Sequence, residues 1–526
     1  MEKNKTTKSG FISALDNKFL MTERGSSVSQ EVIAGIGAFL IAVCALLVNT
    51  QLIGTYYGNY AGAYLAFALM AIIGTVLIAV LSNKPVLMTA NICMSSLIVT
   101  YMGSNSGLTY PNVLVVIFFA GLLSLVITLT PLRKVFIEGI PDGVKKALPV
   151  GVGLYVMGTA LKSSGIITTF GEMANTSELE TLPKLVFWIM IAAIALVVVY
   201  LGFGRKNPLG STYLMMVASM WAIGIIFFME YFVGGQTATT LVYERVNLIV
   251  ATDGASPYNI LNGITALNIG QLFSMGFDFS AYSEAGGNVA KFVIQSVLTF
   301  LFFGMYTNLG NYEGALEAGD MEDNEDDKCN KNLLVVGSAL ATLSPIFGVA
   351  PVTVGAESSV QTKDGGKTGL SSIVCGIGFI IAAFSWVFFA LTATSTNGVG
   401  MWINETEIKL AAYVKDSFQF ADIIMVFAGA TMLKAFRKVD FGKLEEIVPF
   451  AITIAATVFA GNIVCGIAFG SMAAVIIKLI SSDRKNLSYR SALLAVILVA
   501  YILFFLIAGT DFVVVMQQFP MMPMGG

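Results

Sequence analysis

One carboxylate lies within an otherwise uncharged stretch of small and β-favouring residues. The segment APVTVGAESSVQTKDGG, residues 350–366, carries Glu357, whereas the apolar segments elsewhere keep their charges at their ends. An ionisable side chain in an apolar segment is costly and normally faces a cavity or a substrate. Because the chain contains no histidine, proton chemistry must use carboxylates. We therefore predict that Glu357 binds substrate and carries a coupled proton. The alternatives are a protonated glutamate satisfied by a neighbouring helix and a group close enough to the membrane interface to be solvated.

A second polar centre repeats the pattern around Glu357. The segments PVLMTANICMSS (85–96) and PVTVGAESSV (351–360) each read Pro-Val, three variable residues, alanine and a polar residue. Asn91 therefore has the place in the first segment that Glu357 has in the second. The candidate substrate-binding residues are these two, Ser95, Thr353 and Ser358 beside them, and Thr307 and Asn308 in FGMYTNLGN (303–311). Small polar residues of this kind can equally serve as helix-packing contacts or polar helix ends.

The composition indicates an integral membrane protein and excludes several other classes. Of 526 residues, 56% are hydrophobic and 12% are charged, whereas soluble domains are about 25% charged. A net charge of -3 without a basic patch excludes a nucleic-acid partner. The five cysteines show no CxxC spacing, so we expect no metal site and no cofactor. No catalytic constellation of a soluble enzyme is present, so we expect no enzymatic activity.

The apolar runs divide an all-α chain into membrane spans. Fourteen spans are predicted, at 31–54, 61–82, 86–103, 110–131, 147–165, 185–203, 209–234, 289–310, 333–349, 350–361, 368–394, 421–436, 447–461 and 462–480. A further apolar segment at 491–515 is either a fifteenth span or an interfacial segment. The resulting divisions are an N-terminus (1–30), a first repeat of seven spans (31–234), an external loop (235–288), a second repeat (289–480) and a C-terminal segment (481–526).

The basic residues predict the orientation of the chain. With the N-terminus inside, most of the 30 lysine and arginine residues fall on the cytoplasmic side, as the positive-inside rule requires. We therefore expect a multi-pass protein of the plasma or inner membrane with a cytoplasmic N-terminus. Each half holds an odd number of spans, so the halves enter the membrane from opposite sides, which is the inverted repeat of many secondary transporters.

The two segments with the shared pattern open the third span of each half. The twelve residues 350–361 would cover only about 18 Å as a helix, which is too short for the bilayer. A short strand followed by a half-helix would reach further, and such irregular backbone is tolerated only where it faces protein or a water-filled cavity. The N-terminus of each half-helix would then direct N–H donors at a ligand near the midplane of the membrane.

Longer segments resemble one transporter family. They are SVSQEVIAGIGAFLIAVCALLVNTQLI, IPDGVKKALPVGVGLYVMGTALKSSGI, ESSVQTKDGGKTGLSSIVCGIGF and LEEIVPFAITIAATVFAGNIVCGIAFGSMAAVIIKLI, which run in order along most of the chain. The chain resembles the nucleobase/cation symporter-2 superfamily and, within it, the adenine, guanine and hypoxanthine permease (AzgA-like) branch. The family pattern has Ile-Glu-Ser followed by a Gly-Gly-basic-Thr-Gly turn, where this chain has AESS and GGKTG.

The resemblance implies fourteen spans in two inverted sets of seven. A core domain (spans 1–4 and 8–11) would carry the site, with Glu357 contacting a purine base, and a gate domain (spans 5–7 and 12–14) would form the wall against which the core moves. The chain diverges from the family in three spans. Gly304 and Thr307 stand where span 8 of the family has aspartates, and Ser95 where span 3 has an asparagine. The threonine-rich stretch before the glutamate of span 10 is here APVTVGA.

Together these patterns predict a secondary active transporter. It would take up a purine nucleobase of the hypoxanthine, guanine or adenine type by cation symport, with a proton as the usual cation, through alternating access. The alternative is the same scaffold with a changed substrate, such as a small organic or inorganic anion. The expected partners are the base, the coupling cation and the lipid bilayer, and the chain could form a homodimer. A channel or a non-transporting receptor is least expected.

Overall fold

The fold is almost entirely helical and carries long apolar helices. The computed structural model describes residues 10–163, 267–321, 328–384, 420–480 and 488–507. The spans predicted at 185–203 and 209–234 lie outside the described residues. Five described helices are long and apolar enough to cross a membrane: Val28–Gly54, Gly62–Ser82, Tyr110–Leu129, Val289–Ala318 and Ile463–Ile480. The chain is therefore a multi-pass membrane protein, as its composition predicts.

The described elements follow one another in two runs. The first contains α1 (Gly10–Phe19), α2 (Val28–Tyr57), α3 (Tyr60–Ser82), β1 (Met88–Ala90), α4 (Ile92–Ser104), α5 (Tyr110–Leu129), α6 (Arg133–Phe136) and α7 (Asp142–Ser163). The second contains α13 (Gln271–Met275), α14 (Ser280–Glu284), α15 (Val289–Ala318), α16 (Lys328–Leu343), the 3₁₀ helix η2 (Ser344–Phe347), β2 (Val352–Val354), α17 (Ser358–Lys363) and α18 (Gly369–Phe384). It continues with α22 (Phe420–Met432), the 3₁₀ helix η3 (Leu433–Lys438), α23 (Leu444–Ala460), α24 (Ile463–Ile480) and α25 (Tyr489–Ile507).

One predicted span is clearly longer in the structure. The apolar run predicts a helix over 289–310, whereas α15 continues to Ala318. The added turns, NYEGALEA, hold Glu313 and Glu317, which pair with lysines of neighbouring elements. Hydropathy did not indicate this extension, because its two acids interrupt the apolar run, although Tyr312, Ala315 and Leu316 are buried in the main core.

The two strands form a short antiparallel ribbon that joins the two runs of helices. Met88, Thr89 and Ala90 lie opposite Val354, Thr353 and Val352, respectively, and all six residues are buried. Each strand is followed within a few residues by a helix, α4 or α17. The third apolar segment of the first half and the corresponding segment of the second half therefore meet at one place.

Side chains from four surrounding elements satisfy the outer edges of this ribbon. On β1, the Thr75 hydroxyl of α3 accepts from the Met88 N–H at 3.0 Å and donates to the Met88 carbonyl at 3.2 Å. On β2, two α15 residues bond Val354: Asn308 accepts from its N–H at 2.9 Å and Asn311 donates to its carbonyl at 2.7 Å. Asn49 of α2 and Ser344 of η2 bond the Ala90 carbonyl and the Val352 N–H. Unpaired backbone N–H and C=O groups at a strand edge are costly inside a membrane protein. These side chains bond them in place of the neighbouring strands that a larger sheet would have.

Thr75→Val removes both bonds to Met88 while keeping the side-chain shape. We expect a loss of about 1–3 kcal/mol of stability, because two buried backbone groups are left unpaired. A lower thermal unfolding midpoint of the purified protein would show it. Thr50→Val is the matched control, since the Thr50 hydroxyl donates only to the Leu46 carbonyl of its own helix, at 2.7 Å. Equal midpoints for the two variants would contradict the role given to Thr75.

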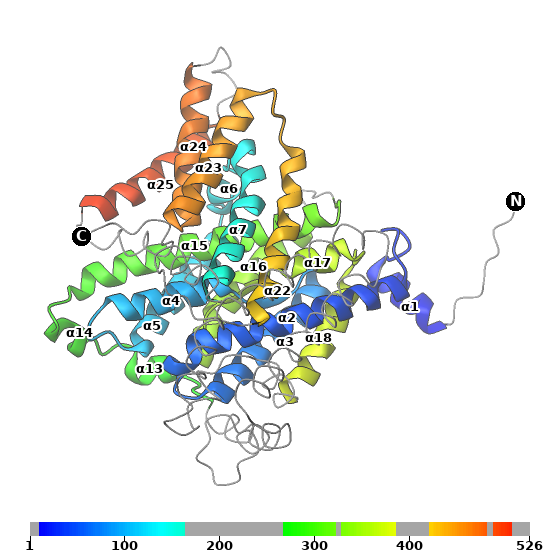
Figure 1. Cartoon of the computed structure of the whole chain (residues 1–526), viewed down its shortest axis with the longest axis horizontal. Coiled ribbons are helices and arrows are strands. Elements are labelled where there is room, and N and C mark those ends of the chain that lie inside the picture. Colours follow the sequence, from blue (N-terminus) through cyan, green and yellow to red (C-terminus); the bar gives the residue numbers. More distant parts are fainter. Residues whose placement is uncertain (1–9, 164–266, 322–327, 385–419, 481–487, 508–526) are drawn as a thin grey trace, which may run out of the picture.

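A separate apolar cluster lies beside the main core. It is distinct from the large cluster that surrounds the ribbon, and its buried residues are Ala147 and Val150 of α7, Ala435 of η3, Val439 directly after η3, and Phe450 of α23. In Figure 1, α23 and α24 lie side by side, and α25 packs against α24. Helix α7 thus packs in both clusters, and α24 contributes Ile463, Val464, Ile467 and Ala468 to the large one.

The extra apolar segment after α24 forms a described helix, α25. Its Tyr501 hydroxyl lies 3.0 Å from the Thr299 hydroxyl of α15, and its Arg490 forms an ion pair of 3.1 Å with Glu138. Helix α25 therefore contacts α15 and the segment after α6 as well as α24.

Candidate functional site

Glu357 lies where the ribbon meets α17. Two residues separate it from the end of β2, and α17 begins directly after it. Its side chain is 1% exposed. The Thr89 hydroxyl of β1 donates a hydrogen bond of 2.9 Å to Glu357 Oε2. Thr89 reaches the carboxylate because the strand register places it opposite Thr353. Antiparallel pairing thus brings together a hydroxyl and an acid that are 268 residues apart in the sequence.

A glycine fills the space beside this hydrogen bond. A Cβ atom at Gly355 would lie 2.0 Å from Glu357 Oε2 and 2.0 Å from the Thr89 hydroxyl oxygen. Any side chain here would displace one of the two groups. The Gly355 N–H also donates to the Leu87 carbonyl at 3.1 Å, which extends the contact between the two segments beyond β2.

Asn91 has the corresponding place before α4. Its side-chain oxygen caps this helix by accepting from the Cys93 N–H at 3.0 Å. Its amide nitrogen donates to the Thr353 hydroxyl at 3.2 Å. Two of the predicted site residues, Asn91 and Thr353, therefore contact each other across the ribbon. Thr89, which pairs with Thr353 in the ribbon, bonds a third, Glu357.

Ser95 contacts Asn49, a residue that the sequence interpretation did not identify. The Ser95 hydroxyl donates to Asn49 Oδ1 at 2.5 Å, and the Asn49 amide donates to the carbonyls of Ala90 and Ala45. Asn49 is fully buried and so ties α2 to both β1 and α4. Its only sequence signal was an amide in the middle of the apolar run AVCALLVNTQLI.

The other three predicted site residues are bonded to backbone groups. The Ser358 hydroxyl accepts from the Leu87 N–H at 3.0 Å, and Asn308 bonds β2 as described above. The Thr307 hydroxyl donates to the Phe303 carbonyl of its own helix at 2.6 Å. The structure thus brings Ser358 and Asn308 to the ribbon, whereas the hydroxyl of Thr307 is engaged within α15. The role of all seven residues in binding substrate stays a prediction.

The first-turn N–H groups of α17 are already engaged in this conformation. Those of residues 358–360 donate to the carbonyls three residues earlier, at 3.0–3.1 Å. A substrate oxygen held by these donors, as the half-helix pattern predicts, would have to replace the bonds of this turn.

Two buried aromatic rings from α7 and α15 pack against each other. Tyr155 of α7 and Phe303 of α15 are buried and pack edge to face, with ring centroids 5.7 Å apart. Cys93, in the first turn of α4, lies within electrostatic range of both Glu357 and Tyr155. Aromatic faces together with a carboxylate suit a flat heteroaromatic ring that carries N–H donors. The sequence interpretation did not single out Tyr155, which stands in the apolar run GVGLYVMG.

Proteins of known type are similar to this chain over nearly its full length. Guanine/hypoxanthine permease PbuO of Bacillus subtilis (strain 168) is 24% identical, over 88% of this chain and 94% of that protein. Adenine permease AdeP of Escherichia coli (strain K12) is 21% identical, over 96% of this chain and 99% of that protein. The homologues of this chain include nucleobase permeases. This confirms the resemblance, and because these relatives are permeases, it also agrees with the expectation that the chain is not an enzyme.

No model of a protein family matches the chain. The transmembrane domain of the cyanobacterium bicarbonate transporter BicA is similar to 85% of this chain and 97% of that chain, with a TM-score of 0.41 and 15% identity.

Proposed function

We propose that the chain is a secondary active transporter that takes up a purine nucleobase of the hypoxanthine, guanine or adenine type. The observation that carries the proposal is the buried carboxylate of Glu357, held at a helix-breaking ribbon in a membrane protein whose relatives are named nucleobase permeases. A purine offers ring N–H groups to a carboxylate and a flat face to aromatic side chains. The relatives do not favour the alternative of a small-anion substrate.

Transport by this site requires movement around Glu357. A base cannot reach a side chain that is 1% exposed until a neighbouring element shifts. The Ser359 hydroxyl of α17 bonds the Thr431 hydroxyl and the Ala428 carbonyl of α22, so α22 closes one side of the site. Alternating access would separate these contacts, with the ribbon and its helices forming the core and with α7 and α22–α24 forming the gate.

Glu357 is also the proposed site of proton coupling. Gly304 and Thr307 offer no carboxylate where related permeases are expected to have aspartates. A protonated Glu357 would still accept from a ring N–H of the base through its carbonyl oxygen, while Thr89 donates to its other oxygen. Loss of the proton to the cytoplasm after release of the base would restore the carboxylate for the next cycle.

The proposal includes fourteen spans in a 7+7 inverted repeat, with the N-terminus in the cytoplasm and the protein in the plasma or inner membrane. Antiparallel pairing between β1 and β2 supports it, because segments that enter the membrane from opposite sides would meet in this way. The distribution of lysine and arginine supports the orientation.

Purified protein in proteoliposomes tests the function directly. We expect saturable uptake of labelled hypoxanthine, guanine or adenine when an inward proton gradient is imposed, and loss of accumulation on adding a protonophore. Unlabelled purines should compete, whereas bicarbonate, sulfate and small carboxylates should not. If anions compete for uptake and purines do not, the substrate is an anion and not a nucleobase.

Thr89→Val tests how the carboxylate is held. This near-isosteric change removes the donor to Glu357, and loss of a hydrogen bond to a charged group of about 1.5 kcal/mol or more raises the KM for the base roughly tenfold or more. Thr100→Val in α4 is the control, because the Thr100 hydroxyl donates to the Ser96 carbonyl of its own helix, at 3.1 Å. An unchanged KM in Thr89→Val would remove Thr89 from the site.

A further inference from the structure

The C-terminal end of α15 carries acidic side chains that pair with lysines of other elements. Glu313 and Glu317 lie one turn apart on α15, and Asp320 follows just beyond the helix. The acids and lysines form three pairs: Glu313 with Lys145 at 3.6 Å, Glu317 with Lys438, and Asp320 with Lys434 at 2.6 Å. Lys434 also donates to the Ala318 carbonyl at 3.1 Å. Every lysine of this set comes from α7 or η3.

These ion pairs join the end of α15 to two neighbouring elements. Helix α15 belongs to the bundle that holds the ribbon, because Asn308 and Asn311 bond β2. Helices α7 and η3 share the small apolar cluster with α23, and α7 also packs in the large cluster. The three pairs therefore join the element that supports the site to two elements that also share a second apolar centre.

The contact surface under the ion pairs is smooth on the α15 side. Gly310 and Gly314 face α7 and α22, respectively: a Cβ at Gly310 would lie 2.5 Å from a methyl carbon of Val152 in α7. A Cβ at Gly314 would lie 2.5 Å from the terminal methyl of Met432 in α22. Glycines permit close approach of helices but provide no side chains that interlock. The ion pairs at the C-terminal end of α15 are therefore the contacts that can hold this glycine surface against the neighbouring helices.

The burial of two of the three acids separates their pairs from ordinary surface contacts, whereas the side chain of Asp320 is 80% exposed. The side chains of Glu313 and Glu317 are each 13% exposed, whereas those of Lys145 and Lys438 are 28% and 52% exposed. Salt screens exposed charges more than partly buried ones. If α15 moved away from α7 and η3, these acids would lose their partners.

We propose that these three ion pairs form a lock that holds the site-bearing bundle closed against α7 and η3 on the side of the molecule where α15 ends. The lock rests on the proposed function, in which closure and opening on this side alternate during transport. The sequence pattern assigns this side to the cytoplasm. Opening the lock would expose the Gly310–Gly314 surface of α15 and the side of the site that it covers.

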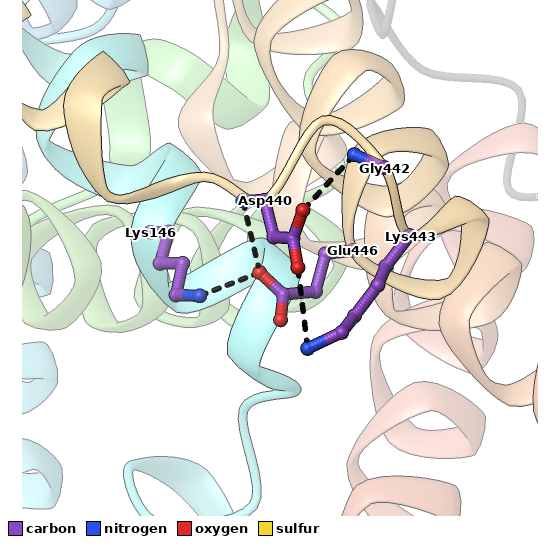
Figure 2. Close-up of polar contacts among 5 residues, drawn as sticks. All are labelled: Lys146, Asp440, Gly442, Lys443 and Glu446. Atoms are coloured by element: carbon purple, nitrogen blue, oxygen red, sulfur yellow. Dashed lines mark hydrogen bonds and ion pairs between the residues drawn. The ribbon is translucent and has the colours of Figure 1, made fainter.

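The neighbouring lysine supplies a matched control. Lys146 lies next to Lys145 but donates to Glu446 of α23 at 2.5 Å and not across to α15. Figure 2 shows Lys146 pointing at Glu446, with the Asp440–Lys443 turn beside them. The hydrogen bond from Lys146 holds the pKa of the Glu446 carboxyl below its ordinary value, so this pair is charged as well. It differs from the lock in the elements it joins.

A buried reporter thiol measures opening without any transport assay. Met432 is fully buried against Gly314, so Met432→Cys, in protein whose native cysteines are replaced, reacts with a water-soluble thiol reagent only while the surface is open. We expect Lys438→Gln or Lys145→Gln to speed labelling about two- to fivefold each, the range that partly exposed ion pairs provide. Lys146→Gln should leave the rate unchanged. Reversing one pair, with Glu317→Lys and Lys438→Glu together, should restore slow labelling.

A crosslink tests whether opening is needed for uptake. A Cβ at Gly314 would lie 3.4 Å from the Met432 Cβ, close to the separation in disulfides, so Gly314→Cys with Met432→Cys should crosslink on oxidation. Uptake should stop on oxidation and return on reduction.

The outcomes of the two measurements are distinguishable. Equal labelling rates in the Lys438→Gln and Lys146→Gln variants would overturn the lock, and so would full uptake by the crosslinked protein. A chain that takes up no purine but shows the predicted labelling pattern would overturn the proposed substrate and leave the lock standing.

Discussion

Glu357→Gln is expected to abolish purine uptake while the protein stays folded. Glutamine has the size of glutamate, and its amide oxygen can still accept the hydrogen bond from Thr89. It brings an N–H₂ group to the place where the base presents N–H donors, and it cannot carry a proton. Loss of one charged hydrogen bond worth up to about 3 kcal/mol already weakens binding by roughly 100-fold. Proton coupling would be lost in addition.

Two measurements separate this effect from misfolding. The variant should elute as the unmodified protein does in size-exclusion chromatography and keep a similar unfolding midpoint, while uptake of labelled base falls to the level of empty liposomes. Glu446→Gln, an equivalent change in the first turn of α23, should retain uptake. Normal uptake by Glu357→Gln would refute both the binding and the coupling role of the residue.

The apolar pattern predicted the long helices well because hydrophobicity alone decides where such helices form. Helices α2, α3 and α5 coincide with the runs 31–54, 61–82 and 110–131 to within a few residues. The pattern failed where other interactions set the boundary. Helix α15 continues to Ala318, although the apolar run ends at residue 310. Helix α22 ends at Met432, and the 3₁₀ helix η3 follows it.

The candidate site was predictable in outline from local sequence. The shared Pro-Val pattern pointed to the two segments that pair as β1 and β2, and a lone acid pointed to Glu357. The supporting contacts were not predictable, because each joins a side chain to a backbone group of another element. Thr75 and Asn311 read as ordinary polar residues of long helices, yet each bonds the outer edge of one strand. Their roles follow only from the packing of helices around the ribbon.

Gly355→Ala is expected to impair substrate binding nearly as strongly as the loss of the carboxylate. The added methyl would lie 2.0 Å from both Glu357 Oε2 and the Thr89 hydroxyl oxygen, far inside van der Waals contact. Both neighbours are fully buried and bonded to each other, so neither can move without breaking the hydrogen bond between them. We expect the carboxylate to turn away from Thr89 and the affinity for the base to fall at least about tenfold, since overpacking of this kind costs typically 1–3 kcal/mol.

Gly103→Ala separates this local effect from the general effect of replacing a helix-region glycine. A Cβ at Gly103, near the C-terminal end of α4, would meet nothing within 4 Å. Binding of labelled base by detergent-solubilised protein should therefore be unchanged in Gly103→Ala and weakened in Gly355→Ala. The Gly355 variant should also gain nothing from the further change Thr89→Val, because the methyl has already removed the bond that Thr89 makes. Additive losses in the double variant would show that Gly355 acts on the site by a route other than the Thr89–Glu357 contact.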